Sequence, residues 1–537
     1  MRKNTLLFVV LIFITDIYGQ RLYKTDIPVV KDEYWWGGVV AYGSRMPYLE
    51  PLAEYDLALR NNNNQVVPLF LSSKGRYLWS DRPFRFEIAG NTLKITSDYE
   101  QVAVQQSGST LRDACLAASR KYFPPTGTLP DELFFTMPQY NTWIELMYNQ
   151  NQEDILKYAQ AVSDNGFPAG VLMIDDNWQK YYGNFDFRPE KFPDAKGMIR
   201  SLHDMGFKLM LWVCPFVSPD SPEYRGLMAD GYLLKRKGSD RPAIINWWNG
   251  QSACYDLTNP KAFGHYVSIL KGMQREYGVD GFKFDAGDNS FYDPQYIDSH
   301  KKDAASVDHT MAWMKTGLEF PFNEYRAGWK MGGQPLVQRL GDKYYSYSAL
   351  QSLIPEMTAA GLLGYAYTCP DMIGGGQIAS FMDLDTKDFD QNLIVRSAQA
   401  HALMPMMQFS VAPWRVLDKE HLAMVRDMAD LHRQFGEYIV GCARESSVTG
   451  EPVARHMAYS FPDEGFETCK DQFMLGDRYM VAPVVTRENK RRIKLPGGKW
   501  KDDKGKLYSG GQTIYMEIPI NRLVYFEKQP AKQTTVN

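Results

Sequence analysis

The sequence has few cysteines, no excess of one sign of charge and no apolar run long enough to cross a membrane. Its six cysteines are scattered through 537 residues without metal-type spacing, so neither a metal cluster nor a disulfide framework organises the chain. Lys and Arg number 60 against 63 Asp and Glu, a net charge of -3, and this balance excludes nucleic acid as an expected partner. No stretch of about 18 apolar residues follows the N-terminus, so we expect no membrane span.

Several common catalytic motifs are missing as well. GxSxG, a Walker loop, HExxH and a strand followed by GxGxxG do not occur, and no histidine-based triad is evident. We therefore expect neither a metal nor an organic cofactor. The sequence carries no feature that indicates an oligomeric state.

The N-terminus has the pattern of a secretory signal. Arg2 and Lys3 precede an apolar run over residues 6–14, and the small residue Gly19 follows. We expect residues 1–20 to be a signal peptide and the protein to be exported, to the periplasm or outside the cell.

Aromatic residues are abundant, at 14% of the chain, with 12 Trp and 33 Tyr. Such rings stack on the C–H faces of sugars, although aromatic-rich cores account for many of them as well.

The pattern of short elements divides the mature chain into three parts. Residues 21–125 read as short alternating strands and turns, typical of a β-sandwich, with a helix over 108–122. Residues 126–438 alternate strand and helix, with an insertion at about 217–253 that we expect to roof the site. Residues 439–537 return to short strands, a second β-domain. The fold class predicted is α/β, a (β/α)8 TIM barrel with an N-terminal β-sandwich and a C-terminal all-β domain.

Eight strands are expected in the barrel, the fifth of them weak. Helices are expected between them over 152–166, 195–206 and 259–278, and a last helix over 419–438. The expected strands cover residues 133–140, 168–176, 207–215, 281–287, 323–329, 335–342, 362–371 and 403–410.

The stretch GVDGFKFDAGD, residues 278–288, is the centre of the functional prediction. It reads as a buried strand that ends at Asp285, and barrel enzymes display catalytic groups at the carboxyl ends of their strands. Capping of the next helix is the alternative role for one such Asp. Polar or aromatic side chains also end other expected strands, which favours a catalytic face: Gln139, Asn141, Asp175, Asp176, Trp212, Lys283, Arg339, Asp342 and Asp371.

The order and spacing of several motifs resemble glycoside hydrolase family 31, the retaining α-glycosidases, over almost the whole mature chain. The motifs are GFPAGVLMIDDNWQ, YDLTNPKAF, GVDGFKFDAGD, RLGDKYYSYSAL, GLLGYAYTCPDMIGGG, EPVARHMAYSFPDE and DQFMLGDRYMVAPV. The resemblance implies that Asp285 is the nucleophile and that Asp342 is the acid/base, with Tyr347 where the family has Trp. It also implies that Arg339 binds sugar. Lys283 supplies a cation near Asp285; for both cations, an interior salt bridge is the structural alternative.

The sugar pocket resembles that of α-galactosidases more than that of α-glucosidases. IDDNWQ, residues 174–179, is similar to the tandem-Asp-plus-Trp element of α-galactosidase families, and strand eight lacks the histidine of glucose-type members. The short segment between Arg339 and Asp342 resembles the branch of the family that includes bacterial α-galactosidases and the animal myogenesis-regulating glycosidase. Trp247 and Trp248 supply walls or pack within their loop. The expected sugar-binding set is Asp175, Asp176, Trp178, Trp212, Lys283, Arg339, Asp371 and Gln408.

The activity predicted is a retaining, exo-acting hydrolysis of terminal α-galactosides in oligosaccharides or glycosides. An α-glucosidase or another α-glycosidase of the same family is the first alternative. A catalytically silent glycan-binding protein on the same scaffold is the second, and the presence of both Asp285 and Asp342 speaks against it.

Overall fold

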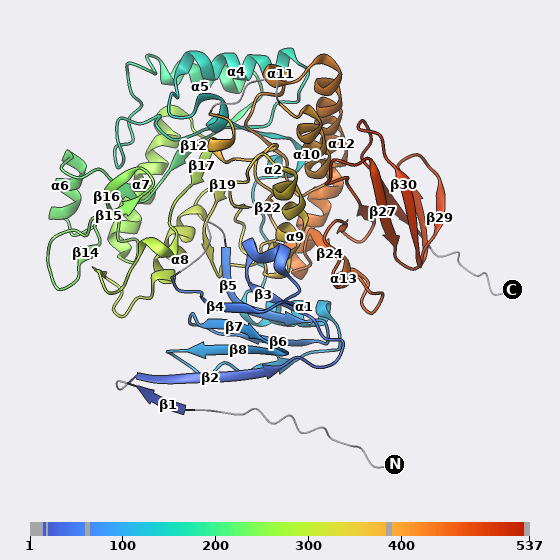
Figure 1. The fold of residues 1–537 in the computed structure, drawn as a ribbon. Coiled ribbons are helices and arrows are strands. Elements are labelled where there is room, and N and C mark those ends of the chain that lie inside the picture. Colours follow the sequence, from blue (N-terminus) through green and yellow to red (C-terminus); the bar gives the residue numbers. More distant parts are fainter. Residues whose placement is uncertain (1–13, 18–19, 60–64, 383–388, 531–537) are drawn as a thin grey trace.

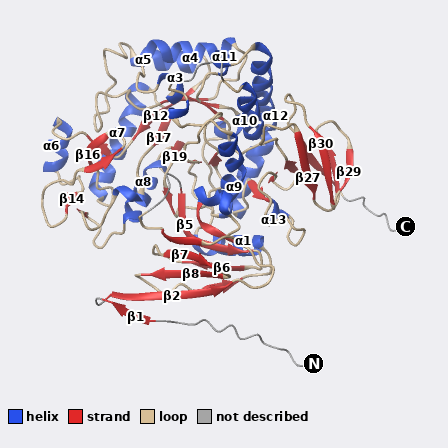
Figure 2. Cartoon of the chain, in the orientation of Figure 1, coloured by secondary structure: helices blue, strands red, loops and turns tan. Residues whose placement is uncertain are grey.

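The computed structural model describes residues 14–17, 20–59, 65–382 and 389–530, in three parts (Figures 1 and 2). A layered β-region, blue in Figure 1, lies under a central barrel, and red C-terminal sheets flank the barrel. Apart from residues 14–17 and 20, the expected signal peptide lies outside the described residues; Ile14–Ile17 form strand β1 beside β2 (Gln20–Pro28).

The N-terminal part is the expected β-sandwich. Phe70 of one sheet packs edge-on against Phe86 of the other, with ring centroids 4.9 Å apart. One sheet has the order β1, β2, β8 (Thr92–Ser97), β7 (Arg85–Ala89) and β4 (Leu52–Asp56); the other has β20 (Gly328–Trp329), β5 (Gln65–Ser72), β6 (Arg76–Trp79) and β9 (Val104–Gln106), with β3 (Trp35–Val39) also on β5. Because β20 belongs to the barrel part of the chain and pairs with β5, backbone hydrogen bonds fix the barrel onto the sandwich.

Eight parallel strands form the barrel, as predicted. A bridge between Met372 and Gln408 joins the last strands and nearly closes the ring. In sheet order the strands are β22 (Thr368–Cys369), β21 (Gln338–Arg339), β19 (Phe322–Tyr325), β17 (Gly281–Phe284), β12 (Lys208–Val213), β11 (Val171–Ile174), β10 (Gln139–Asn141) and β23 (Gln408–Phe409).

The first strand begins later than predicted. Residues Leu133–Thr136 form the short helix α2, which packs on α12 (Lys419–Thr449), and only Gln139–Asn141 are extended. An apolar run of this length does not distinguish a buried helical turn from a strand. The Asp131 carboxylate accepts a hydrogen bond from the N–H of Leu133 and starts the helix.

The predicted helices α4 (Gln152–Asp164), α5 (Ala195–Asp204) and α7 (Pro260–Tyr277) are confirmed. Asn259 caps α7, Pro260 occupies its first turn, and Gly278 ends it with a φ of 83°. The last helix, α12, was predicted too short: it continues beyond residue 438 to Thr449.

The insertion after β12 carries helix α6 (Pro222–Ala229) and four short strands, β13 (Phe216–Val217), β14 (Lys235–Arg236), β15 (Ile245–Trp247) and β16 (Gly250–Cys254). Part of its apolar side chains, with Trp212 and Tyr292, form a second hydrophobic core separate from the main one, whereas others join the main core. The β15–β16 hairpin therefore has its own packing support beside the barrel (Figure 1).

The C-terminal part is all-β, as predicted. Its larger sheet has the order β24 (Ala454–His456), β25 (Phe473–Leu475), β26 (Tyr479–Val481), β31 (Tyr525–Gln529), β28 (Lys499–Asp502) and β29 (Leu507–Ser509), and β27 (Lys490–Leu495) pairs with β30 (Gln512–Glu517). Within the described ranges, no helix combines the length and apolarity that a membrane crossing needs.

Candidate active site

A cavity of about 290 Å³ lies at the carboxyl ends of the barrel strands. It brings together Asp285 and Asp342, which lie far apart in the sequence. Its lining comprises Trp143, Tyr148, Asp175, Asp176, Trp212, Trp248, Lys283, Asp285, Arg326, Arg339, Asp342, Met372, Gln377 and Ile378.

Asp285 directly follows β17, and its side chain is 12% exposed. The indole N–H of Trp212 donates to its Oδ2 at 2.8 Å, and Arg326 Nε lies 3.6 Å from its Oδ1. Burial alone would raise the pKa of Asp285, but Arg326, Lys283, Arg339 and the Trp212 hydrogen bond outweigh it and lower that pKa. The site therefore keeps Asp285 ionised, as a nucleophile requires.

The turn after Asp285 is a tight one. Ala286 has a φ of 57°, which is uncommon for a residue with a side chain, and a Cβ at Gly287 would lie 2.1 Å from Cδ1 of Trp313. Asp288, not Asp285, precedes the next helical turn at Asn289–Phe291. The alternative role of Asp285 as a helix cap is therefore wrong.

Asp342 lies in the loop after β21, and its side chain is 33% exposed. Arg339 Nη1 donates to its Oδ1 at 2.6 Å. Burial would raise the pKa of Asp342, yet Arg339, Arg326 and Lys283 hold that pKa below its usual value. The sugar-free site thus favours the ionised form, whereas an acid catalyst must start protonated.

The tandem carboxylates after β11 both line the cavity. Lys283 Nζ donates to Asp175 Oδ2 at 2.5 Å, so the interior salt bridge considered for Lys283 is present, at the cavity wall. Burial and the neighbouring Asp175 raise the pKa of Asp176 to about 7. Tyr182 and Asn249 both donate to Asp176 Oδ2, at 3.0 and 2.8 Å.

Three predicted sugar-binding residues do not line the cavity, and their assignment is corrected. Trp178 is fully buried, and its indole N–H donates to the carbonyl of Trp212. Asp371 lies behind Arg339, whose Nη1 donates to it at 3.0 Å. Gln408 points into the barrel and donates to Gln139 and Glu324. Each supports a wall or the barrel interior instead.

Of the two tryptophans of the insertion, Trp248 forms part of the cavity wall and Trp247 packs within its loop. Trp248 is 44% exposed and lines the cavity, with Arg326 over its ring at 4.7 Å from the centroid. Trp247 is buried against Phe216, with ring centroids 4.4 Å apart, and does not line the cavity.

The prediction missed Arg326, which forms an ion pair with Asp285. Arg326 follows β19, the weakest strand in the sequence pattern, because Asn323 and Glu324 interrupt its apolar run. Its position directly after Tyr325, at a strand end, was the available signal. Trp143 and Tyr148 were also missed, because they follow β10 in short segments without a recognisable motif.

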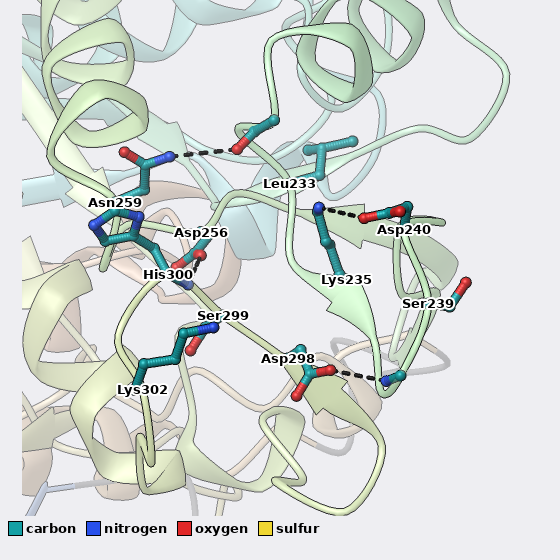
Figure 3. A pocket seen from close by; sticks show the side chains of 12 residues that line it. Leu233, Lys235, Ser239, Asp240, Asp256, Asn259, Asp298, Ser299, His300 and Lys302 are labelled. Carbon is teal, nitrogen blue, oxygen red and sulfur yellow. Dashed lines mark hydrogen bonds and ion pairs between the residues drawn. The ribbon is translucent and has the colours of Figure 1, made fainter.

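A larger cavity, of about 690 Å³, lies elsewhere and holds none of these groups. Figure 3 shows that its polar groups largely pair with one another: Lys235 with Asp240, Asp298 with the N–H of Gly238, and Asp256 with the N–H of His300. It is open and polar, so we do not assign the chemistry to it. Within the part of the chain that the structure describes, no group of three or more His, Cys, Asp or Glu is arranged to hold a metal ion.

Comparison with known proteins identifies the family. Residues 135–440 match the profile of the glycosyl hydrolases family 31 TIM-barrel domain, and residues 450–530 match that of the family's C-terminal domain. The chain is 32% identical over 423 residues to the myogenesis-regulating glycosidase of Mus musculus, covering 76% of this chain and 58% of that protein. It is 24% identical over 483 residues to the alpha-xylosidase XylQ of Lactiplantibacillus pentosus, covering 83% and 60%. It therefore spans about three fifths of the length of these two relatives.

Solved structures agree on the fold. The family 31 dextranase of Flavobacterium johnsoniae, complexed with glucose, has a TM-score of 0.84 at 20% identity, over 96% of this chain and 67% of that one. A family 31 alpha-xylosidase from a soil metagenome, complexed with xylose, has a TM-score of 0.82 at 20% identity, over 97% and 81%. The likeness therefore extends over nearly the whole described fold. The chain belongs to glycosyl hydrolase family 31.

Proposed function

We propose that the protein is a retaining, exo-acting α-glycosidase that hydrolyses terminal non-reducing α-galactosyl residues. One observation carries the proposal: Asp285 and Asp342 line one small cavity, and Arg326 and Arg339 act electrostatically on both carboxylates. Two carboxylates that face one sugar-binding hollow are the equipment of glycoside hydrolysis.

The reaction would proceed in two displacements. Asp285 attacks the anomeric carbon while Asp342 gives a proton to the glycosidic oxygen, and a glycosyl ester forms on Asp285. Asp342 then takes a proton from water, which attacks the anomeric carbon and releases the sugar. The indole N–H of Trp212 donates to Oδ2 of Asp285, and the backbone N–H of Ala286 donates to its Oδ1 at 2.9 Å, so both carboxylate oxygens are held in place.

Galactose as the sugar is supported by the tandem Asp175 and Asp176, which both line the cavity. Adjacent carboxylates on one wall offer acceptors for neighbouring hydroxyls, including an axial one. Strand eight, β23, carries Gln408, which does not line the cavity, and no histidine is among the described residues that line it.

Other α-glycosides are the second candidate, because relatives named alpha-xylosidase and alpha-glucosidase match most of this chain at 24% and 25% identity. Glycan binding without turnover is the third candidate. The ion pair with Arg339 favours the ionised form of Asp342, which has no proton to give to the leaving oxygen.

The test is a panel of 4-nitrophenyl α-glycosides together with a covalent trap. We expect turnover of the α-galactoside above the α-glucoside and α-xyloside. We also expect a 2-deoxy-2-fluoro-α-galactosyl fluoride to label Asp285, as located by peptide mass spectrometry. D285A should abolish both, whereas D288N, which changes a buried neighbour that contacts Arg326, should retain labelling. Preference for another sugar would reject the galactose assignment, and no turnover and no label with any sugar would favour binding alone.

A further inference from the structure

Asp371 is a fully buried carboxylate that shares one guanidinium with the candidate acid. Arg339 Nη1 donates to Oδ1 of Asp342 at 2.6 Å and to Oδ1 of Asp371 at 3.0 Å. Asp342 is a third exposed, whereas Asp371 has no exposed surface. The two carboxylates therefore compete for one cation from opposite positions, one at the cavity and one behind it.

The backbone holds Asp371 firmly in this position. The N–H groups of Lys343 and Gly376 both donate to its Oδ2, at 2.8 and 3.0 Å. Its own φ of 80° lies in the left-handed region, which disfavours a residue with a side chain. A Cβ at Gly376 would lie 2.8 Å from Asp371 Oδ1 and 3.0 Å from Asp342 Oδ1, so that glycine leaves room for both oxygens.

The arrangement bears on how Asp342 can change its charge. An acid/base residue is neutral in one step and ionised in the next. Without Asp371, protonation of Asp342 would leave the buried guanidinium of Arg339 with only Glu324, 3.4 Å from its Nε, as a counter-charge, which is costly. A second carboxylate on the same nitrogen removes that cost.

We propose that Asp371 is a positioning residue that keeps Arg339 paired while Asp342 takes up and releases its proton. The inference rests on the acid/base role proposed for Asp342. When Asp342 is neutral, Arg339 stays paired with Asp371. When Asp342 has given its proton to the glycosidic oxygen, the new carboxylate shares Arg339 again, and the proton from water restores the first state.

Other charged or titratable groups also act on the pair. Lys283 and Arg326 act on Asp342 from β17 and from the end of β19, Glu324 approaches Arg339, and His401 of α10 (Gln391–Ala402) lies near the backbone of Asp371. These four side chains belong to other strands and helices, so a substitution at Asp371 leaves them in place. The balance between Asp342 and Asp371 can therefore be tested separately.

The first experiment needs no substrate. A water-soluble carbodiimide reacts with protonated carboxyl groups, so the pH dependence of labelling at Asp342, read by peptide mass spectrometry, reports its titration. Burial raises the pKa of Asp371 to about 6, whereas Arg339 and the N–H of Lys343 favour its ionised form. D371N removes this competing carboxylate, and we expect the midpoint of labelling to fall by about one pH unit. E356Q is the matched control: it removes a buried carboxylate that pairs with Lys343 in the same loop but does not contact Arg339. We expect no change of midpoint for it.

G376A provides a second variant that changes no charge. Its methyl group would press on Oδ1 of both Asp371 and Asp342. Because two backbone N–H groups hold Asp371, the more exposed Asp342 should move away from Arg339, and the midpoint should rise, opposite to D371N. An unchanged midpoint in D371N would overturn the proposal; if D371N does not fold, an unchanged or lower midpoint in G376A would do so.

Kinetics separate positioning from a merely structural role. D371N should slow hydrolysis of glycosides with poor leaving groups more than about tenfold, with the basic limb of kcat/KM shifted to lower pH, and should spare activated leaving groups. Equal losses on both, with an unmoved limb, would mean that Asp371 only stabilises the loop. A wild-type protein that hydrolyses no glycoside would refute the proposed function, yet the labelling midpoints would still decide the charge balance.

Discussion

Replacement of Arg326 by Gln should change the pH dependence of the reaction, because this guanidinium forms an ion pair with Asp285. The Nε to Oδ1 distance is 3.6 Å, and both side chains are almost buried. At this distance and an effective dielectric constant of about 20, a unit-charge pair is worth roughly 4 to 5 kcal/mol. The realised effect is smaller, since Arg326 also faces Asp288 at 3.4 Å and since Lys283 and Arg339 remain.

We expect R326Q to raise the pKa of Asp285 by about one to two pH units, or about 1.4 to 2.7 kcal/mol. The nucleophile must be ionised, so the acidic limb of kcat/KM should move to higher pH by that amount. The assay is a pH profile on an activated aryl α-glycoside, which needs no acid catalysis. R326K, which keeps the charge, should move the limb less.

W248A is the matched control for the stacking contact. It removes the ring under Arg326 while leaving the guanidinium in place. We expect a higher KM and an acidic limb close to that of the wild-type. If R326Q leaves the limb where it is in the wild-type, the assignment of Arg326 as the group that keeps Asp285 ionised is wrong.

Three further predictions concern the surroundings of the site and the fold. W178F should lower the free energy of unfolding by about 1 to 3 kcal/mol, measured in urea, because the buried carbonyl of Trp212 loses its hydrogen-bond donor. W212F should instead lower kcat, because Trp212 donates to Asp285. If both variants changed stability and kcat equally, the placement of Trp178 behind the wall and of Trp212 at the cavity would be contradicted. The Tyr182 hydroxyl donates to Asp176 and favours its ionised form, so Y182F should raise the pKa of Asp176 and move the pH inflection of KM above about 7. An unmoved inflection would refute that role of Tyr182. Burial lowers the pKa of His401, His432 and His456 to about 4, so their contribution to stability is present above pH 6.5 and is lost as the pH falls towards 4. Each should cost about 1 to 2 kcal/mol between pH 7 and pH 5, and equal unfolding free energies at these two pH values would contradict this.

The sequence predicted eight barrel strands, although the first begins later than expected, and an apolar run that ends in a carboxylate marked Asp285. The role of Asp342 came from the resemblance to family 31. The sequence could not tell which side chains face the cavity. Asp371 and Gln408 come at or just after strand ends, as Asp285 does, yet they turn behind Arg339 and into the barrel. Side-chain direction at a strand end depends on the turn that follows, such as the left-handed conformation at Asp371.

Polar side chains buried inside the barrel, and the residues they contact, were the hardest to predict. Glu324 is buried in β19, where Gln408 donates to it and Arg339 lies 3.4 Å away. A carboxylate there lowers the apolar content of the strand and hides its end, where Arg326 follows. The pairing partner, Gln408, is 84 residues distant in sequence. No local pattern could have joined them.

The charges of the site suit a reaction in which negative charge moves from one carboxylate to the other. In the first displacement of the proposed mechanism, Asp285 becomes a neutral ester while Asp342 becomes ionised, so the number of negative carboxylates stays constant. Arg326 and Arg339 each act on both residues, and each also has a buried carboxylate partner, Asp288 or Asp371. Neither guanidinium is left unpaired at any step. Lys283 also acts electrostatically on both carboxylates, and it is hydrogen-bonded to Asp175 of the cavity wall. Loss of either arginine should therefore slow both displacements, and loss of Lys283 should in addition leave Asp175 of the cavity wall without its cation.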